Sequence, residues 1–118
     1  MCGILIVYSK KKTLNKKNCE MLSKLIYNRG PDKILKEYFY SGKLFIANSI
    51  LSITGKIKKN SNLYKSKNSK YAISFNGEIY NYKNLSNKYL KNKYPLNDTD
   101  VLVNLYNTDT HYKIAKKL

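Results

Sequence analysis

A cysteine occupies the second position of the chain, directly after Met1. A thiolate is a strong nucleophile, but a free thiol has a pKa of about 8.5, so a base must take its proton. If Met1 is removed, Cys2 gains an α-amine with a pKa of about 7.8, which can act as that base directly or through a water. An aminopeptidase removes methionine when the second residue is small, as Cys2 is. The position fits an N-terminal nucleophile, and it fits equally well an early buried residue of a first strand.

A second set of residues suited to acyl chemistry lies in "NGEIYNY" at 76–82. The side-chain amide of Asn76 and the backbone N–H of Gly77 are donors of the kind that stabilise a tetrahedral oxyanion. Glycine at position 77 leaves the approach to that N–H open, and its backbone can adopt conformations closed to other residues. Without further motifs, Asn-Gly is also the usual sequence of a hairpin turn.

The other reactive side chains form no recognisable site. Cys2 and Cys19 are too few for a disulfide framework, and His111 is the single histidine. The sequence contains no Cys-x-x-Cys pair, so we expect no structural zinc site. It also lacks the glycine-rich phosphate-binding motifs, so we expect no nucleotide site and no cofactor in this chain. Cys19 is interpreted as a core thiol and His111 as a surface imidazole.

The chain carries a formal net charge of +16, but its basic residues are almost all lysine. Arg29 is the single arginine, and sequence-specific nucleic-acid sites favour arginine because its guanidinium forms a fork of donors. The abundant Lys, Asn, Ile and Tyr are residues of AT-rich codons. We therefore interpret the charge as a solvated lysine surface, with weak nonspecific attraction to polyanions and no specific nucleic-acid partner.

The hydrophobic pattern predicts a mixture of strands and helices. Strands are expected over 3–8, over 35–53 as a strand–turn–strand unit with its turn at Ser41-Gly42, and over 71–75. Helices are expected over 13–27 with Thr13 as a cap, over 83–93 ending before Pro95, over 97–107, and from 111 to the end. Asn97 and Asp98 are both good N-caps for the third helix. The segments 28–33 and 54–70 are predicted as loops.

These elements indicate an α+β fold. A chain of 118 residues suits one small domain or part of a larger one, and no linker or internal repeat divides it. No apolar run approaches the roughly 20 residues needed to span a membrane, and the N-terminus does not read as a secretory signal. We expect a cytoplasmic protein without a membrane partner.

Five stretches together resemble the class II glutamine amidotransferases, whose nucleophile is N-terminal. They are "MCGI" at the start, "RGPD" at 29–32, "LSI" at 51–53, "NGEIYNY" at 76–82 and "NDTDVLV" at 97–103. Their order and spacing are most similar to those of the N-terminal domain of glutamine-hydrolysing asparagine synthetases. The resemblance implies an αββα sandwich of the N-terminal-nucleophile hydrolases, with the nucleophile at the start of a central strand.

The resemblance also implies a reaction and its residues. Cys2 would attack the side-chain amide of L-glutamine, release ammonia, and form a thioester that water hydrolyses to glutamate. Asn76 and Gly77 would form the oxyanion hole. Asp98 would hold the substrate ammonium, Glu78 would share in substrate contacts, and Arg29 would mainly organise the loop near the site. Asp98 could also cap its helix.

Two departures from the family set limits on this reading. The family has an arginine directly before "LSI" that grips the substrate carboxylate, and this chain has Ile50 there. The resemblance covers residues 1–118 but only the front part of the domain, so we expect an incomplete sandwich whose sheets lack partner strands. The synthetase domain, where ATP and Mg²⁺ would act, is also absent from this sequence.

These features favour the glutaminase part of an asparagine synthetase-like enzyme, with a separate chain as a possible supplier of the missing parts. The alternative is a non-catalytic remnant of the domain that binds a partner. A small basic nucleic-acid-binding module is a third, weaker alternative, and it requires salt-dependent binding.

Overall fold

The computed structural model describes residues 2–53, 56–57, 63–66, 71–91, 94–106, 113 and 116. The chain divides into two compact units. The first comprises Met1–Ser52, Lys59–Leu63 and Ser74–Gly77, and the second comprises Ile53–Lys58, Tyr64–Ile73 and Glu78–Leu118. Strands and helices occur in both units, which confirms the α+β class.

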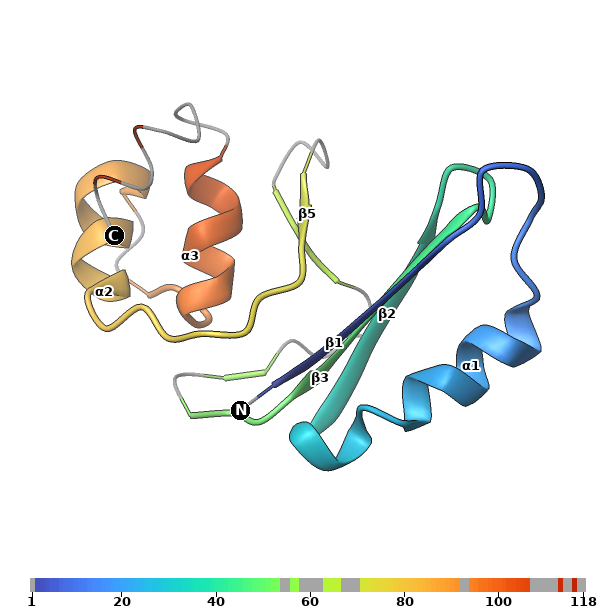
Figure 1. Ribbon diagram of the computed structural model, residues 1–118. Helices are drawn as coiled ribbons and strands as arrows, with labels where there is room; N and C mark the ends of the chain where they lie inside the picture. Colours follow the sequence, from blue (N-terminus) through green and yellow to red (C-terminus); the bar gives the residue numbers. More distant parts are fainter. Residues whose placement is uncertain are drawn as a thin grey trace. The chain divides into compact units, whose positions relative to one another are not determined.

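The first unit is built on a three-stranded antiparallel sheet with the order β1-β3-β2 (Figure 1). Its strands are β1 (Gly3–Tyr8), β2 (Lys33–Phe39) and β3 (Leu44–Ile50). β1 has the predicted bounds, and its β-branched run suits a pleated surface. Among the described residues β1 pairs only with β3, so β1 lies at a sheet edge. This differs from the central strand that the resemblance implies after Cys2.

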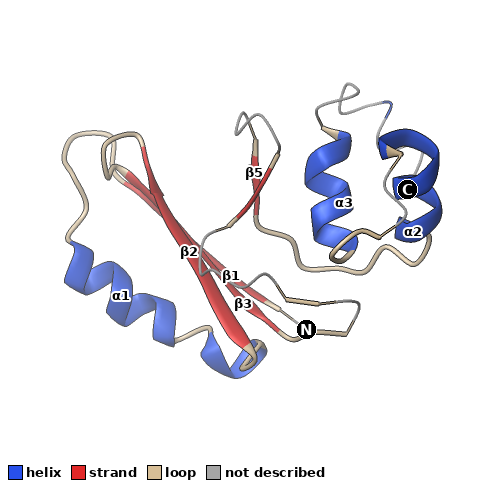
Figure 2. Cartoon of the chain, turned by 180° about the vertical axis from the view of Figure 1, so that it is seen from behind, coloured by secondary structure: helices blue, strands red, loops and turns tan. Residues whose placement is uncertain are grey.

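Helix α1 (Lys16–Lys24) packs against one face of this sheet, as Figures 1 and 2 show from opposite sides. Cys19 is buried there against Phe45 and Ala47 of β3, as expected for a core thiol. The helix begins later than predicted, and its N-cap is Asn15, which accepts a hydrogen bond from the Asn18 N–H. The predicted cap, Thr13, lies in the preceding loop, where its neighbour Leu14 is tied by its N–H to the β2–β3 connection.

The β2–β3 connection contains four residues, 40–43, instead of the predicted two-residue turn. Tyr40, Ser41 and Gly42 have φ angles of 50°, 53° and 80°. Left-handed backbone is favourable only for glycine, so Tyr40 and Ser41 are strained. The connection is held by hydrogen bonds from Gly42 N to Phe39 O and from Leu14 N to Gly42 O.

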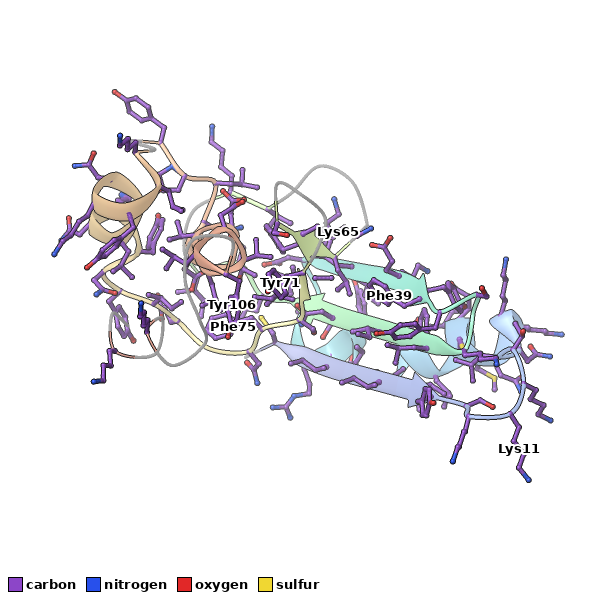
Figure 3. All side chains as sticks on the ribbon, turned by 90° about the horizontal axis from the view of Figure 1, so that it is seen from above. Lys11, Phe39, Lys65, Tyr71, Phe75 and Tyr106 are labelled. Carbon is purple, nitrogen blue, oxygen red and sulfur yellow. The ribbon has the colours of Figure 1, made fainter. Side chains whose placement is uncertain are left out.

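The second unit combines a small sheet with helices. Its strands β4 (Tyr64–Lys65) and β5 (Ala72–Ile73) pair antiparallel, and α3 (Asp98–Leu105) contacts both strands. The rings of Tyr71 and Tyr106, labelled in Figure 3, lie with their centroids 5.7 Å apart. β4 falls in the segment predicted as a loop, and β5 is shorter than the predicted strand over 71–75.

The helix predicted over 83–93 has two parts, α2 (Tyr82–Leu85) and a π-helical turn, η2 (Ser86–Leu90). It ends at Lys91, whose φ of 52° is left-handed, and therefore ends before Pro95 is reached. Both α2 and η2 contact α3, and the buried residues of these elements include Tyr82 and Leu85 of α2, Ser86 of η2 and Leu105 of α3. His111 and most of the helix predicted from 111 to the end lie outside the described residues.

Candidate active site

Cys2 lies directly before β1 and is only partly buried. Its Sγ lies 3.9 Å from the carbonyl oxygen of Leu51, the residue that follows β3. Because Cys2 stands outside the strand and reaches solvent, the alternative of a buried strand residue is wrong.

A buried serine fixes the backbone next to Cys2. The Gly3 N–H donates to Ser49 Oγ at 3.0 Å, and this hydroxyl donates to the Ile26 carbonyl at 2.6 Å. Ser49 is fully buried on β3 directly opposite Gly3. One hydroxyl therefore joins the start of β1, the centre of the sheet and the segment that follows α1.

The neighbouring Asn48 completes this support. Its Nδ2 donates to the Gly3 carbonyl at 3.0 Å, and its side chain is 2% exposed. Both backbone polar groups of Gly3 are thus bonded to side chains of β3. The sequence analysis missed both residues. The signal is the pair Asn48-Ser49 in the otherwise apolar strand "LFIANSI", because buried polar groups must find partners.

Gly3 is required by space. A Cβ built at this position would lie 2.7 Å from Ser49 Oγ, 3.0 Å from Ile26 Cβ and 3.2 Å from Arg29 Cβ. Any larger residue would push the start of β1 off the serine. The same distances place Arg29 beside the start of β1, next to the residue after Cys2.

The "RGPD" stretch closes over the end of β3. A Cβ at Gly30 would lie 2.5–2.6 Å from backbone atoms of Ser49 and Ile50, so only glycine fits there. The Asp32 N–H donates to the Ile50 carbonyl at 3.1 Å, and Asp32 Oδ2 accepts from the Ser52 N–H at 2.7 Å. This clasp brings Arg29 and position 50 to the same end of the sheet as Cys2. The Arg29 side chain is exposed.

Asn76 and Gly77 are exposed and belong to the first unit, as Cys2 does. They do not form a hairpin turn, because the chain continues from β5 towards α2 without a following strand. Gly42 is the single glycine with a positive φ among the described residues, so the expectation of a special backbone conformation at Gly77 is wrong. A Cβ at Gly77 would lie 2.7 Å from the Phe75 ring, so a larger residue there would require this ring to shift.

Asp98 and Glu78 belong to the second unit. Asp98 is 6% exposed, and its Oδ2 accepts the Ile79 N–H at 3.1 Å, while its Oδ1 accepts the Thr99 N–H at 2.8 Å. Glu78 is half-buried and directly precedes Ile79, the residue whose N–H binds Asp98.

The N-cap of α3 is Asn97, whose side chain accepts the Asp100 N–H at 3.0 Å. The prediction that Asp98 also caps this helix is therefore wrong. Asp98 is the first helical residue, where its negative charge suits the helix dipole.

Among the residues that the structure describes, no group of three or more His, Cys, Asp or Glu side chains could hold a metal ion. No helix in this part of the chain is long and apolar enough to cross a membrane.

Comparison with known proteins gives two matches. The model of the glutamine amidotransferase domain family matches residues 1–117. A probable glutamine-hydrolyzing asparagine synthetase of Acanthamoeba polyphaga mimivirus is 33% identical over 111 residues, which are 91% of this chain and 20% of the viral protein. The chain thus spans about a fifth of that relative's length. No solved structure matches.

Proposed function

Because the chain belongs to the glutamine amidotransferase domain family, we propose that it hydrolyses L-glutamine to glutamate and ammonia, with Cys2 as the nucleophile. One observation carries the proposal. Cys2 is partly exposed and directly precedes Gly3. Both backbone polar groups of Gly3 are bonded to buried side chains of β3, which hold the start of β1 in place. A nucleophile held on a rigid strand end meets the substrate in one geometry.

In the first half of the reaction, the α-amine of a chain that begins at Cys2 takes the thiol proton. The thiolate attacks the side-chain amide carbon of glutamine, and a carbon–sulfur bond forms. The negative oxygen of the tetrahedral intermediate accepts hydrogen bonds from Asn76 Nδ2 and Gly77 N–H. The carbon–nitrogen bond then breaks, and ammonia leaves with the proton that the α-amine returns.

In the second half, a water molecule gives a proton to the same amine and attacks the thioester carbon. The carbon–sulfur bond breaks, glutamate leaves, and the thiol regains its proton. The α-amine serves as base and acid in both halves, so the reaction needs no histidine. No metal or nucleotide takes part in these steps, and ATP and Mg²⁺ are assigned to a synthetase domain outside this chain.

Asp98 is the proposed partner of the substrate ammonium, and Glu78 shares in substrate contacts. The Asp98 Oδ1 accepts both the backbone N–H and the hydroxyl of Thr99, whereas its Oδ2 accepts the Ile79 N–H and keeps a second lone pair for a ligand. Arg29 is assigned to the organisation of the "RGPD" clasp, because it stands beside Gly3 at the start of that clasp.

Ile50 is the weak point of the proposed substrate site. A guanidinium at this position would form a charge-assisted contact with the substrate carboxylate, worth about 1.5–3 kcal/mol. Each 1.4 kcal/mol is tenfold in affinity, so its loss weakens glutamine binding about ten- to a hundredfold. This residue favours the second candidate, a non-catalytic remnant that binds a partner.

We further propose that residues 1–118 form the front part of an αββα sandwich of the N-terminal-nucleophile hydrolases. A separate chain with the remaining strands and a synthetase domain would complete the sandwich and use the ammonia to make asparagine. The similarity to a probable glutamine-hydrolyzing asparagine synthetase of mimivirus supports this place in asparagine synthesis. A cytoplasmic location fits such a reaction.

Release of glutamate from glutamine by the full chain tests the proposal. Cys2→Ala should abolish release, whereas Cys19→Ala should retain it, because Cys19 is buried in the core. Asn76→Ala should lower kcat with little change in KM, because its amide acts on the transition state. Equal activity of Cys2→Ala and wild type would refute the proposal, and inactivity of the wild type at saturating glutamine would favour the remnant.

A further inference from the structure

Lysines gather at the end of the three-stranded sheet that lies away from Cys2. The segments 9–18 and 40–43 contain six lysines and no acidic residue. They are Lys10, Lys11, Lys12, Lys16, Lys17 and Lys43. All except the half-buried Lys43 are exposed. Figure 3 shows Lys11 projecting beyond this end of the strands.

The two lysine segments are held together by the backbone. The Ser9 N–H donates to the Lys43 carbonyl at 2.9 Å, and the Leu14 N–H donates to the Gly42 carbonyl at 2.9 Å. A Cβ at Gly42 would lie 2.9 Å from Thr13 Cγ2, so the loop lies tightly on the turn. These bonds therefore bring the loop that carries Lys10, Lys11 and Lys12 onto the turn that carries Lys43, just before Lys16 and Lys17 begin α1. A surface of one sign raises the local concentration of anions.

Two exposed aromatic rings border this surface. Tyr8 ends β1 and is 64% exposed, and Tyr40 begins the β2–β3 connection and is 75% exposed. Leu44 is the cross-strand partner of both Tyr8 and Phe39, so both tyrosines lie at the same sheet end as the lysines. Tyr40 also holds an unfavourable left-handed backbone, with φ 50°, where glycine or asparagine would fit better. Neither the burial of the Tyr40 ring nor its backbone explains a tyrosine at this position.

We propose that this lysine–tyrosine end, defined as these six lysines with Tyr8 and Tyr40, binds single-stranded nucleic acid without sequence preference. Proteins with that activity combine a positive track for the phosphates with exposed aromatic rings on which bases stack. Such binding needs point charges and π-faces, which lysine and tyrosine supply, and it does not need the arginine forks of sequence-specific sites. In a duplex the bases are already stacked on one another, so they would not stack on the tyrosine rings. The surface is separate from Cys2, so this proposal stands independently of the glutaminase proposal.

The test is fluorescence anisotropy of a labelled oligouridylate of about 16 nucleotides with the full chain. If all six lysines contact phosphates, affinity should fall about 300-fold between about 50 and 200 mM salt. The triple variant Lys10→Gln, Lys11→Gln, Lys12→Gln should reduce the slope of log affinity against log salt by about 2. The matched triple variant of the exposed lysines of the second unit, Lys56→Gln, Lys83→Gln, Lys88→Gln, should leave it unchanged.

The tyrosines separate stacking from charge. Tyr8→Leu and Tyr40→Leu should each weaken binding of the oligouridylate about fivefold or more, and Tyr8→Phe should restore it. An abasic phosphodiester chain of equal length has no bases to stack, so it should bind more weakly than the oligouridylate. Neither leucine variant should change its affinity. An oligothymidylate in place of the oligouridylate distinguishes DNA from RNA as the source of the strand.

Four results would overturn the proposal. The first is an affinity that does not depend on salt, and the second is an equal effect of the two lysine triple variants on the slope of log affinity against log salt. The third is full affinity of both leucine variants, and the fourth is equal binding of polyglutamate at matched charge. The last two would leave an acidic surface of any kind as the partner.

Discussion

Replacing Ser49 with alanine should destabilise the fold strongly for so small a change. The hydroxyl is fully buried, accepts the Gly3 N–H at 3.0 Å and donates to the Ile26 carbonyl at 2.6 Å. Its removal leaves both groups without these partners, and a buried unpaired group costs about 1–3 kcal/mol. Gly3 is buried, but Ile26 is half-buried, so water partly replaces the hydrogen bond that the Ile26 carbonyl loses. The expected decrease in the free energy of unfolding is about 2–4 kcal/mol.

Urea unfolding of the full chain measures this decrease, with Ser23→Ala as the matched control. Ser23 is 2% exposed, but its hydroxyl donates only to the Glu20 carbonyl of the same helix. Removal of this hydroxyl leaves no group outside the helix without a partner, and alanine favours the helix. The free energy of unfolding should therefore change by no more than about 0.5 kcal/mol. If the two variants lose equal stability, or if Ser49→Ala behaves as wild type, the serine does not clamp β1. The proposed rigid support of Cys2 would then be incorrect.

Three other changes test separate parts of the account. Ile50→Arg should lower the glutamine KM for glutamate release about ten- to a hundredfold, and an unchanged KM would show that position 50 does not face the substrate carboxylate. Ser41→Gly should relieve a left-handed residue and raise the free energy of unfolding by about 1 kcal/mol, seen as a higher urea midpoint, whereas a lower midpoint would contradict the φ of 53°. Burial raises the pKa of Tyr38, and negative charge on Cys19 and Glu20 adds to this rise. Tyr38 therefore contributes stability that is full below about pH 10 and is lost as the pH rises above that value. Tyr38→Phe should lose less stability than wild type above about pH 10. If Tyr38→Phe and wild type lose stability equally as the pH rises, Tyr38 is not the cause of the loss.

Local sequence features predicted the elements that depend on local chemistry. The apolar run over 3–8 forms β1 with the expected bounds, and Asn97 caps α3 as expected. The cap of α1 moved from Thr13 to Asn15 because the loop before it is bonded to a distant turn. β4 was missed because it has two residues and exists only through its pairing with β5.

The candidate site was predictable only in part, for a similar reason. Motifs identified Cys2 and the "RGPD" stretch, and the structure brings both to one end of the sheet. The polar pair Asn48-Ser49 stands out in an apolar strand, but its contacts join residues more than 20 positions apart, so the sequence does not identify their partners. Gly77 was expected to have a special backbone conformation, whereas the structure shows a close approach to the Phe75 ring, whose position the sequence does not give.

The central claim is that Cys2, freed of Met1, is the nucleophile. Intact-mass and peptide mass spectrometry after reaction with a chloromethyl ketone analogue of glutamine tests it most directly. We expect a chain that begins at Cys2 and carries one adduct, on the Cys2 sulfur, with protection by excess glutamine. A chain that retains Met1, or an adduct on Cys19 with Cys2 unmodified, would contradict it.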